Sequence, residues 1–255
     1  MHKGYNLSLS GDVGKYLGYR EAGVRIFDAQ MKAVRQRLDQ FVLPDGLLDA
    51  TKLQGRWFPS IAADVFISHS HADRDLALGF AGYLSEKFNL TSFIDSCVWG
   101  FGDELLKSID QKYCYQPETK TYVYEKRNRS TSHVHMMLST ALSSMIDHCE
   151  CLFFMNTPSS ITPLDVIGKN GDGTLSPWIY SEIAFSRLVR RKPAPRTRPT
   201  EKAFVKVARE LSEQVQILYS VEMDHLGALK STDLDRWLAS SVLSKDHPLD
   251  VLYRM

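Results

Sequence analysis

The fold is decided by residues 64–95, which read DVFISHSHADRDLALGFAGYLSEKFNLTSFID. The continuous apolar run at 65–67 predicts a short buried strand, and residues 91–95 predict a second strand. Between them, apolar residues recur at helical spacing and predict one face of an amphipathic helix: Leu76, Phe80, Tyr83, Leu84 and Phe88. A strand, a helix and a strand in this order predict a parallel βαβ unit.

The same alternation continues toward the C-terminus. Further helices are predicted at about 103–112, 137–146, 177–189, 204–211 and 234–238, and further strands at 151–155 and 215–221. Strands separated by helices predict a parallel sheet with helices on both faces. Because ligands bind beyond the carboxyl ends of the strands in such sheets, we expect the chemistry after residues 67, 95, 155 and 221.

Three segments fall outside this alternation. Residues 1–60 contain one clear helical stripe, at 27–41, and are predicted to be an N-terminal helical extension of a domain over 61–255. Residues 113–135 and 157–176 are predicted to be insertions. The first is predicted to be a hairpin around Pro117-Glu118, with tyrosines and bordering cations: Tyr113, Tyr115, Tyr122, Tyr124, Lys126, Arg127 and Arg129.

Composition narrows the class of protein. The 255 residues are 44% hydrophobic and 24% charged, as in ordinary globular proteins. A formal net charge of +1 argues against a nucleic-acid partner, because no overall field attracts phosphate. Four cysteines are too few for a disulfide scaffold and predict reduced thiols. With no apolar leader and no run of 18 apolar residues, we expect a cytoplasmic protein with no membrane partner.

The turn after the first strand allows two interpretations. Residues 68–73, SHSHAD, resemble the metal-binding motif of the metallo-β-lactamase superfamily, in which His69 and His71 would hold zinc. This chain has Arg74 where that family expects a further histidine ligand. The alternative is a polar loop that caps the next helix, and we predict no metal site.

Three motifs together resemble the TIR domain family. Residues 64–69, DVFISH, with Asp73 shortly after, are similar to its first strand and loop. Residues 93–95, FID, followed after six residues by 102–105, GDEL, are similar to its second strand and BB loop. Residues 178–182, WIYSE, look like the Trp-x-x-x-Glu motif of TIR domains that cleave NAD. The resemblance covers about residues 63–240 and implies a flavodoxin-like fold.

The chemistry of Glu182 agrees with that resemblance. Glu182 lies four residues after Trp178, so both side chains project from one face of a helix. Because the nicotinamide of NAD leaves as a neutral molecule from a cationic one, no general acid is needed to expel it. One carboxylate that favours the oxocarbenium-like charge on the ribose is then sufficient, whereas ordinary glycosidases need two carboxyl groups.

The resemblance implies further contacts with substrate. His69, Ser70 and His71 would line the phosphate and ribose side of the cleft. In the predicted loop at 99–102, Trp99, Phe101 and Gly102 would contact a base or a neighbouring protomer, because the BB loop of an adjacent copy commonly completes a TIR site. We predict that Asp95 and Asp103 are structural and cap helices.

The resulting expectation is a bacterial NAD-cleaving TIR enzyme with Glu182 as its catalytic residue, NAD as substrate and no cofactor. It resembles stand-alone TIR proteins of antiphage systems such as Thoeris, in which a separate effector protein responds to the product. The product is ADP-ribose if water reacts with the ribosyl cation, and a cyclic ADP-ribose if adenine reacts. The alternative is a non-catalytic TIR module that assembles with other TIR domains.

Overall fold

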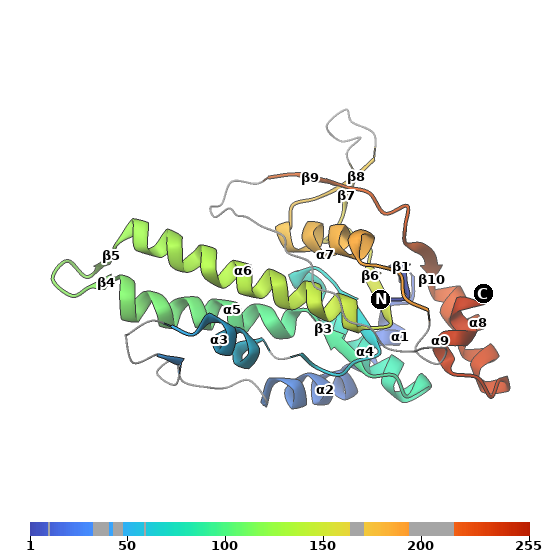
Figure 1. Ribbon diagram of the computed structural model, residues 1–255. Coiled ribbons are helices and arrows are strands. Elements are labelled where there is room, and N and C mark those ends of the chain that lie inside the picture. Colours follow the sequence, from blue (N-terminus) through green and yellow to red (C-terminus); the bar gives the residue numbers. More distant parts are fainter. Residues whose placement is uncertain (10, 33–40, 43–47, 59, 164–170, 194–216) are drawn as a thin grey trace.

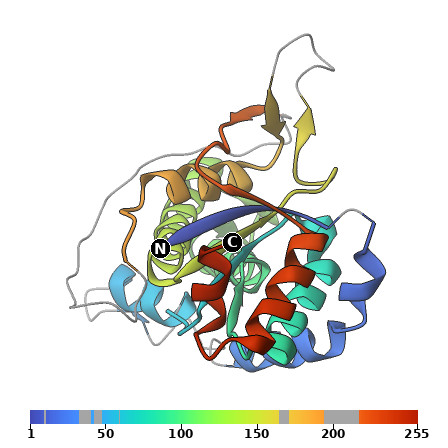
Figure 2. The same ribbon diagram turned by 90° about the vertical axis from the view of Figure 1, so that its right-hand side faces the viewer.

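The chain folds around a parallel sheet of five strands. The computed structural model describes residues 1–9, 11–32, 41–42, 48–58, 60–163, 171–193 and 217–255. The strands of the sheet lie in the order β10-β1-β6-β2-β3 (Figures 1 and 2). They are β1 (Lys3–Ser8), β2 (Val65–Ser68), β3 (Ser92–Ile94), β6 (Cys151–Met155) and β10 (Gly227–Lys230). The predicted α/β class with a flavodoxin-like parallel sheet is confirmed.

Helices cover both faces of this sheet (Figure 2). On one face α4 packs against α1, α2 and α8, and on the other α6 packs against α3, α5 and α7. α9 packs on α8. The bounds of the helices are α1 (Val13–Leu17), α2 (Arg20–Lys32), α3 (Ala50–Trp57), α4 (Arg74–Phe88), α5 (Ser96–Ile109), α6 (Tyr124–His148), α7 (Pro177–Leu188), α8 (Ser231–Leu243) and α9 (Pro248–Tyr253).

The contact between α2 and α4 is a backbone contact. A Cβ atom added to Gly23 would lie 1.8 Å from the carbonyl oxygen of Leu78. One added to Gly82 would lie 2.2 Å from the carbonyl oxygen of Tyr19. Only glycine lets these two segments of backbone approach so closely.

Most elements predicted between residues 64 and 189 are confirmed. They are β2, α4, β3, β6 and α7, together with α6, which is longer than its predicted core. The predicted hairpin is also confirmed, as β4 (Tyr115–Gln116) paired with β5 (Thr121–Tyr122). The predicted insertion 113–135 also contains the end of a π-helical turn (Asp110–Cys114) and the first half of α6, which extends away from the sheet beside α5 (Figure 1).

The N-terminal segment corrects one prediction. We predicted that residues 1–60 form a helical extension outside the sheet, but residues 3–8 form β1, which lies between β6 and β10 and is parallel to both. Its sequence, KGYNLS, buries Tyr5 and Leu7 and leaves Lys3 and Asn6 half-buried. β1 therefore lacks the continuous apolar run that marks β2, although it has a strand on each side in the sheet.

Two further predictions are corrected. Within the predicted strand at 215–221, residues 219–221 form β9 (Tyr219–Val221), which pairs antiparallel with β8 (Asp172–Thr174) in a small separate sheet with β7 (Thr162–Pro163). The predicted loop at 99–102 is part of α5 instead. The predicted helix at 204–211 and most of residues 33–41 lie outside the described residues.

Candidate functional site

Four polar side chains meet at the carboxyl ends of β2 and β3. Ser68 ends β2 and His69 follows it, while Asp95 directly follows β3. The fourth is Glu182 on α7, a helix that begins at Pro177 because Ser176 caps it by accepting a hydrogen bond from the Ile179 amide at 3.2 Å. This placement puts Glu182 one turn beyond Trp178, where it faces the sheet. We call these four residues the Glu182 cluster.

Direct contacts join the members of the Glu182 cluster. The Ser68 hydroxyl donates a hydrogen bond to Oε2 of Glu182 at 2.5 Å. Nδ1 of His69 lies against Oδ1 of Asp95. Each of the four side chains is at most 2% exposed, so water is excluded from the whole cluster.

Burial changes the protonation of Glu182. The pKa of its carboxyl is raised well above the usual value, chiefly because burial disfavours the charged form and secondly because the negative charge of Asp95 lies close by. The hydrogen bond from Ser68 acts in the opposite direction but is the smaller effect. Burial and the neighbouring Asp95 therefore both favour the protonated form of Glu182 in this closed arrangement.

One nitrogen of the cluster keeps unused hydrogen-bonding capacity. Nε2 of His69 is buried and has no aligned hydrogen-bond partner among the described residues. Buried polar atoms without a partner are rare and unfavourable in folded proteins. Such atoms at the carboxyl end of a parallel sheet are where a polar ligand would be satisfied.

The predicted residues Ser70 and His71 do not join the cluster. The Ser70 hydroxyl donates to Asp73 at 2.5 Å, and Thr157, just after β6, donates to the same carboxylate at 2.5 Å. This network ties the ends of β2 and β6 together. His71 is exposed, whereas His69 is buried in the cluster. No group of three His, Cys, Asp or Glu side chains in the described part of the chain is arranged to hold a metal ion.

The other predicted contact residues lie along α5 and α7. The half-buried ring of Trp178 meets the ring of His135 edge-on, with centroids 5.6 Å apart. Burial lowers the pKa of His135, while the charge of Asp103 opposes this shift. Gly102 is buried inside α5, where an added Cβ would lie 3.2 Å from Leu138. The side chains of Trp99 and Phe101 lie outside the described part of the structure.

Sequence reasoning missed two members of the cluster. We predicted that Asp95 is a helix cap, but its side chain makes no capping hydrogen bond and contacts His69 instead. The predicted cap Asp103 lies inside α5 rather than at its start. Ser68 lies within the motif at residues 68–73, but the motif does not single it out. The signal for both was position, because each stands where a parallel strand ends.

Neither of two cavities along the helices is lined by a residue of the Glu182 cluster. A cavity of about 230 Å³ lies between α5 and α6, and one of about 150 Å³ lies beside α7; Glu182 lines neither. Since Glu182 is only 1% exposed, a substrate reaches it only after a neighbouring segment moves.

Comparisons with protein families, with curated proteins and with solved structures give no match for this chain. The resemblance to TIR domains therefore rests on the three sequence motifs. None of the described helices is both long enough and apolar enough to cross a membrane.

Proposed function

We propose that this protein cleaves the bond between nicotinamide and ribose in NAD, with Glu182 as the essential carboxyl group. The observation that carries the proposal is the Glu182 cluster itself. A buried carboxyl hydrogen-bonded to Ser68 and close to Asp95 stands at the carboxyl ends of two parallel strands. The Trp-x-x-x-Glu spacing and the order of the motifs support the same activity.

The reaction needs little from the protein besides charge and position. When the C–N bond breaks, its electron pair moves to the pyridinium nitrogen, and positive charge develops on the ribose. An ionised Glu182 stabilises that charge and accepts a proton from the attacking water. Because burial favours the protonated form of Glu182 in the closed structure, its carboxyl must be ionised before it acts. A cationic nicotinamide ring bound beside it favours this ionisation, because a nearby positive charge lowers a carboxyl pKa.

Trp178 supports the same geometry. Its ring lies one helical turn from Glu182, and an aromatic face attracts a cationic ring. By analogy with TIR enzymes, the proposal includes that the nucleotide product is a signal in bacterial antiphage defence and that a separate effector protein responds to it. If adenine rather than water reaches the ribosyl carbon, the product is cyclic and lighter than ADP-ribose by one water.

The decisive experiment measures nicotinamide release from NAD at high protein concentration, with the nucleotide products resolved by mass. Glu182→Gln keeps the size of the side chain and its hydrogen bond with Ser68, but it removes the ionisable group. We expect it to lower release by at least about 100-fold. Glu86→Gln, an exposed glutamate on α4, is the matched control and should release nicotinamide as the wild type does. Equal release by wild type and Glu182→Gln would refute the site.

A non-catalytic interaction module is the second candidate, and the complete burial of Glu182 is the observation that favours it. It predicts no nicotinamide release by the wild type, even under crowding that promotes self-association. It also predicts that Glu182→Gln assembles as the wild type does.

A further inference from the structure

The far end of the α5 and α6 pair carries no part of the Glu182 cluster. Here α5 continues as a π-helical turn (Asp110–Cys114), the β4–β5 hairpin follows, and α6 begins. We call residues 110–129 the tip. Figure 1 shows the tip at the end of the two helices, well away from the sheet. Every side chain from residue 115 to residue 122 is exposed.

Four tyrosines cover the tip. Their exposed fractions lie between 37% and 67%. Tyr115 and Tyr122 are cross-strand partners in the hairpin, and their ring centroids are 5.3 Å apart. Exposed aromatic rings gathered at one place are uncommon on the surface of a protein without a partner there, and they mark binding surfaces.

The charge of the tip is mainly positive. It contains five cations and three carboxylates. One of these carboxylates, Asp110, is buried and compensated, because Arg127 Nε and the Ser130 hydroxyl donate to it at 2.8 and 2.5 Å. The exposed carboxylates of the tip are Glu118 and Glu125, and the cations of the tip are Lys112, Lys120, Lys126, Arg127 and Arg129.

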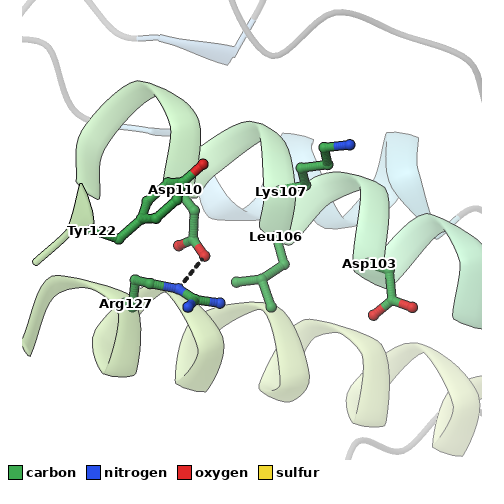
Figure 3. A pocket seen from close by; sticks show the side chains of 6 residues that line it. All are labelled: Asp103, Leu106, Lys107, Asp110, Tyr122 and Arg127. Atoms are coloured by element: carbon green, nitrogen blue, oxygen red, sulfur yellow. Dashed lines mark hydrogen bonds and ion pairs between the residues drawn. The ribbon is translucent and has the colours of Figure 1, made fainter. Parts of the chain in front are cut away.

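Cations and rings are interleaved at the tip. The ammonium of Lys112 lies 5.6 Å from the ring centre of Tyr113, and the guanidinium of Arg127 lies 5.5 Å from that of Tyr122. Tyr122 and Arg127 also line the cavity of about 230 Å³ between α5 and α6. Figure 3 shows both side chains at one end of this cavity, with Leu106 between the helices and Asp103 at the other end. The tip is therefore a surface with a hollow beside its aromatic and cationic groups.

The geometry points to single-stranded nucleic acid as the ligand of the tip. Unpaired bases stack on exposed aromatic rings, and lysine and arginine bind the phosphates between them. A membrane surface is a poorer match, because residues 115–122, YQPETKTY, offer no aliphatic side chain to insert. The net charge of +1 for the whole chain does not reveal this surface, because acidic residues elsewhere cancel the positive excess of the tip. This inference is independent of the activity proposed for Glu182.

Fluorescence anisotropy of the full chain with labelled single-stranded DNA and RNA of about 16 nucleotides tests the inference. We expect binding that weakens as salt concentration rises. The double variant Tyr115→Ala, Tyr122→Ala should lower the affinity at least tenfold, because each stacked base loses its ring. The double variant Tyr115→Phe, Tyr122→Phe keeps both rings and should bind nearly as the wild type does.

The charge variants separate phosphate binding from stacking. Lys126→Gln with Arg129→Gln should reduce the slope of log affinity against log salt concentration by about 0.7 for each phosphate that the variant no longer neutralises. Lys87→Gln and Lys245→Gln, exposed lysines outside the tip, should leave the slope unchanged.

Several results would overturn the inference. It fails if neither oligonucleotide binds, if the Tyr→Ala variant binds equally well while remaining folded by circular dichroism, or if a duplex competes as well as a single strand. Binding to vesicles of anionic lipid with no binding to the oligonucleotides would replace it with a membrane contact.

Discussion

The Glu182 cluster and the tip both gather ionisable side chains, but water reaches only one of them. In the cluster, each side chain is at most 2% exposed and Glu182 is held by Ser68. At the tip, tyrosines and cations lie in solvent, whereas the carboxylate of Asp110 is buried. The difference determines what each region is able to do.

Burial makes ionisation of a carboxyl group in the cluster unfavourable. A carboxyl without water resists ionisation, so its protonation responds strongly to any nearby charge. Exposed charges are hydrated and screened by salt, so they contribute little to folding and remain available to a partner. We therefore expect changes in the cluster to alter stability and its pH dependence, and changes to the exposed side chains of the tip to alter binding with little effect on stability.

The largest effect is expected from Glu182→Gln on stability. In the unfolded chain the Glu182 carboxyl loses its proton near pH 4.5, whereas in the folded chain it keeps the proton to higher pH. In the pH interval above 4.5 the folded state therefore binds more protons than the unfolded state. The free energy of unfolding of the wild type therefore falls as pH rises through this interval. The variant lacks the ionisable proton and should gain stability over the wild type by up to about 1.4 kcal/mol per pH unit.

Urea unfolding of both proteins at several pH values between about 5 and 8 measures this gain. Glu86→Gln, at an exposed position, should follow the wild type at every pH. A constant difference between wild type and Glu182→Gln across this range would contradict the assignment of the raised pKa to Glu182.

Ser68→Ala should have the next largest effect. It removes the donor to Oε2 of Glu182 and leaves that buried oxygen without its hydrogen bond. We expect a loss of about 1–3 kcal/mol in the free energy of unfolding. The control is Ser108→Ala on α5, whose exposed hydroxyl bonds to the Glu104 carbonyl within its own helix and should change stability by less than about 0.5 kcal/mol. Similar losses in the two variants would mean that Ser68 does not support Glu182.

A smaller effect is expected from Asp95→Asn. It removes the negative charge that contributes to the raised pKa of Glu182, so that pKa should move back toward its usual value. As pH rises, the free energy of unfolding of Asp95→Asn should then stop falling at a lower pH than that of the wild type. Asp103→Asn is the matched control, because Asp103 lies inside α5 and not in the cluster. An unchanged interval in Asp95→Asn would leave desolvation as the only cause of the shift.

These regions also differ in how far sequence predicts them. Apolar runs and helical spacing predicted β2, α4 and β3, so the strand ends that carry Ser68 and Asp95 were placed correctly. β1 was missed because Lys3 and Asn6 interrupt its apolar pattern. The positions in the sheet beyond β6 are filled by β1 and β10, and only long-range pairing determines that order.

The candidate site was predicted only in part for a similar reason. A motif identified Glu182 and His69, but the contact between His69 and Asp95 joins residues on different strands, and no local pattern indicates it. The closure of the cluster depends on how α7 packs on the sheet, which a one-dimensional pattern does not contain. The hairpin of the tip was predicted because its turn and tyrosines are local features.

The smallest effect on stability is expected at the tip. Tyr122→Ala removes a ring that contacts Tyr115 and Arg127 in solvent, so the free energy of unfolding should change by less than about 0.5 kcal/mol. Asp110→Ala is the matched contrast at the base of the same region. It removes the buried carboxylate that accepts hydrogen bonds from the Ser130 hydroxyl and from Arg127 Nε, and it should cost about 1–3 kcal/mol. Urea unfolding of the two variants compares them directly. If Tyr122→Ala loses several kcal/mol in the free energy of unfolding, the hairpin is part of the folded core. The exposed tyrosines of the tip would then be structural, and the contrast with the buried Asp110 would not hold.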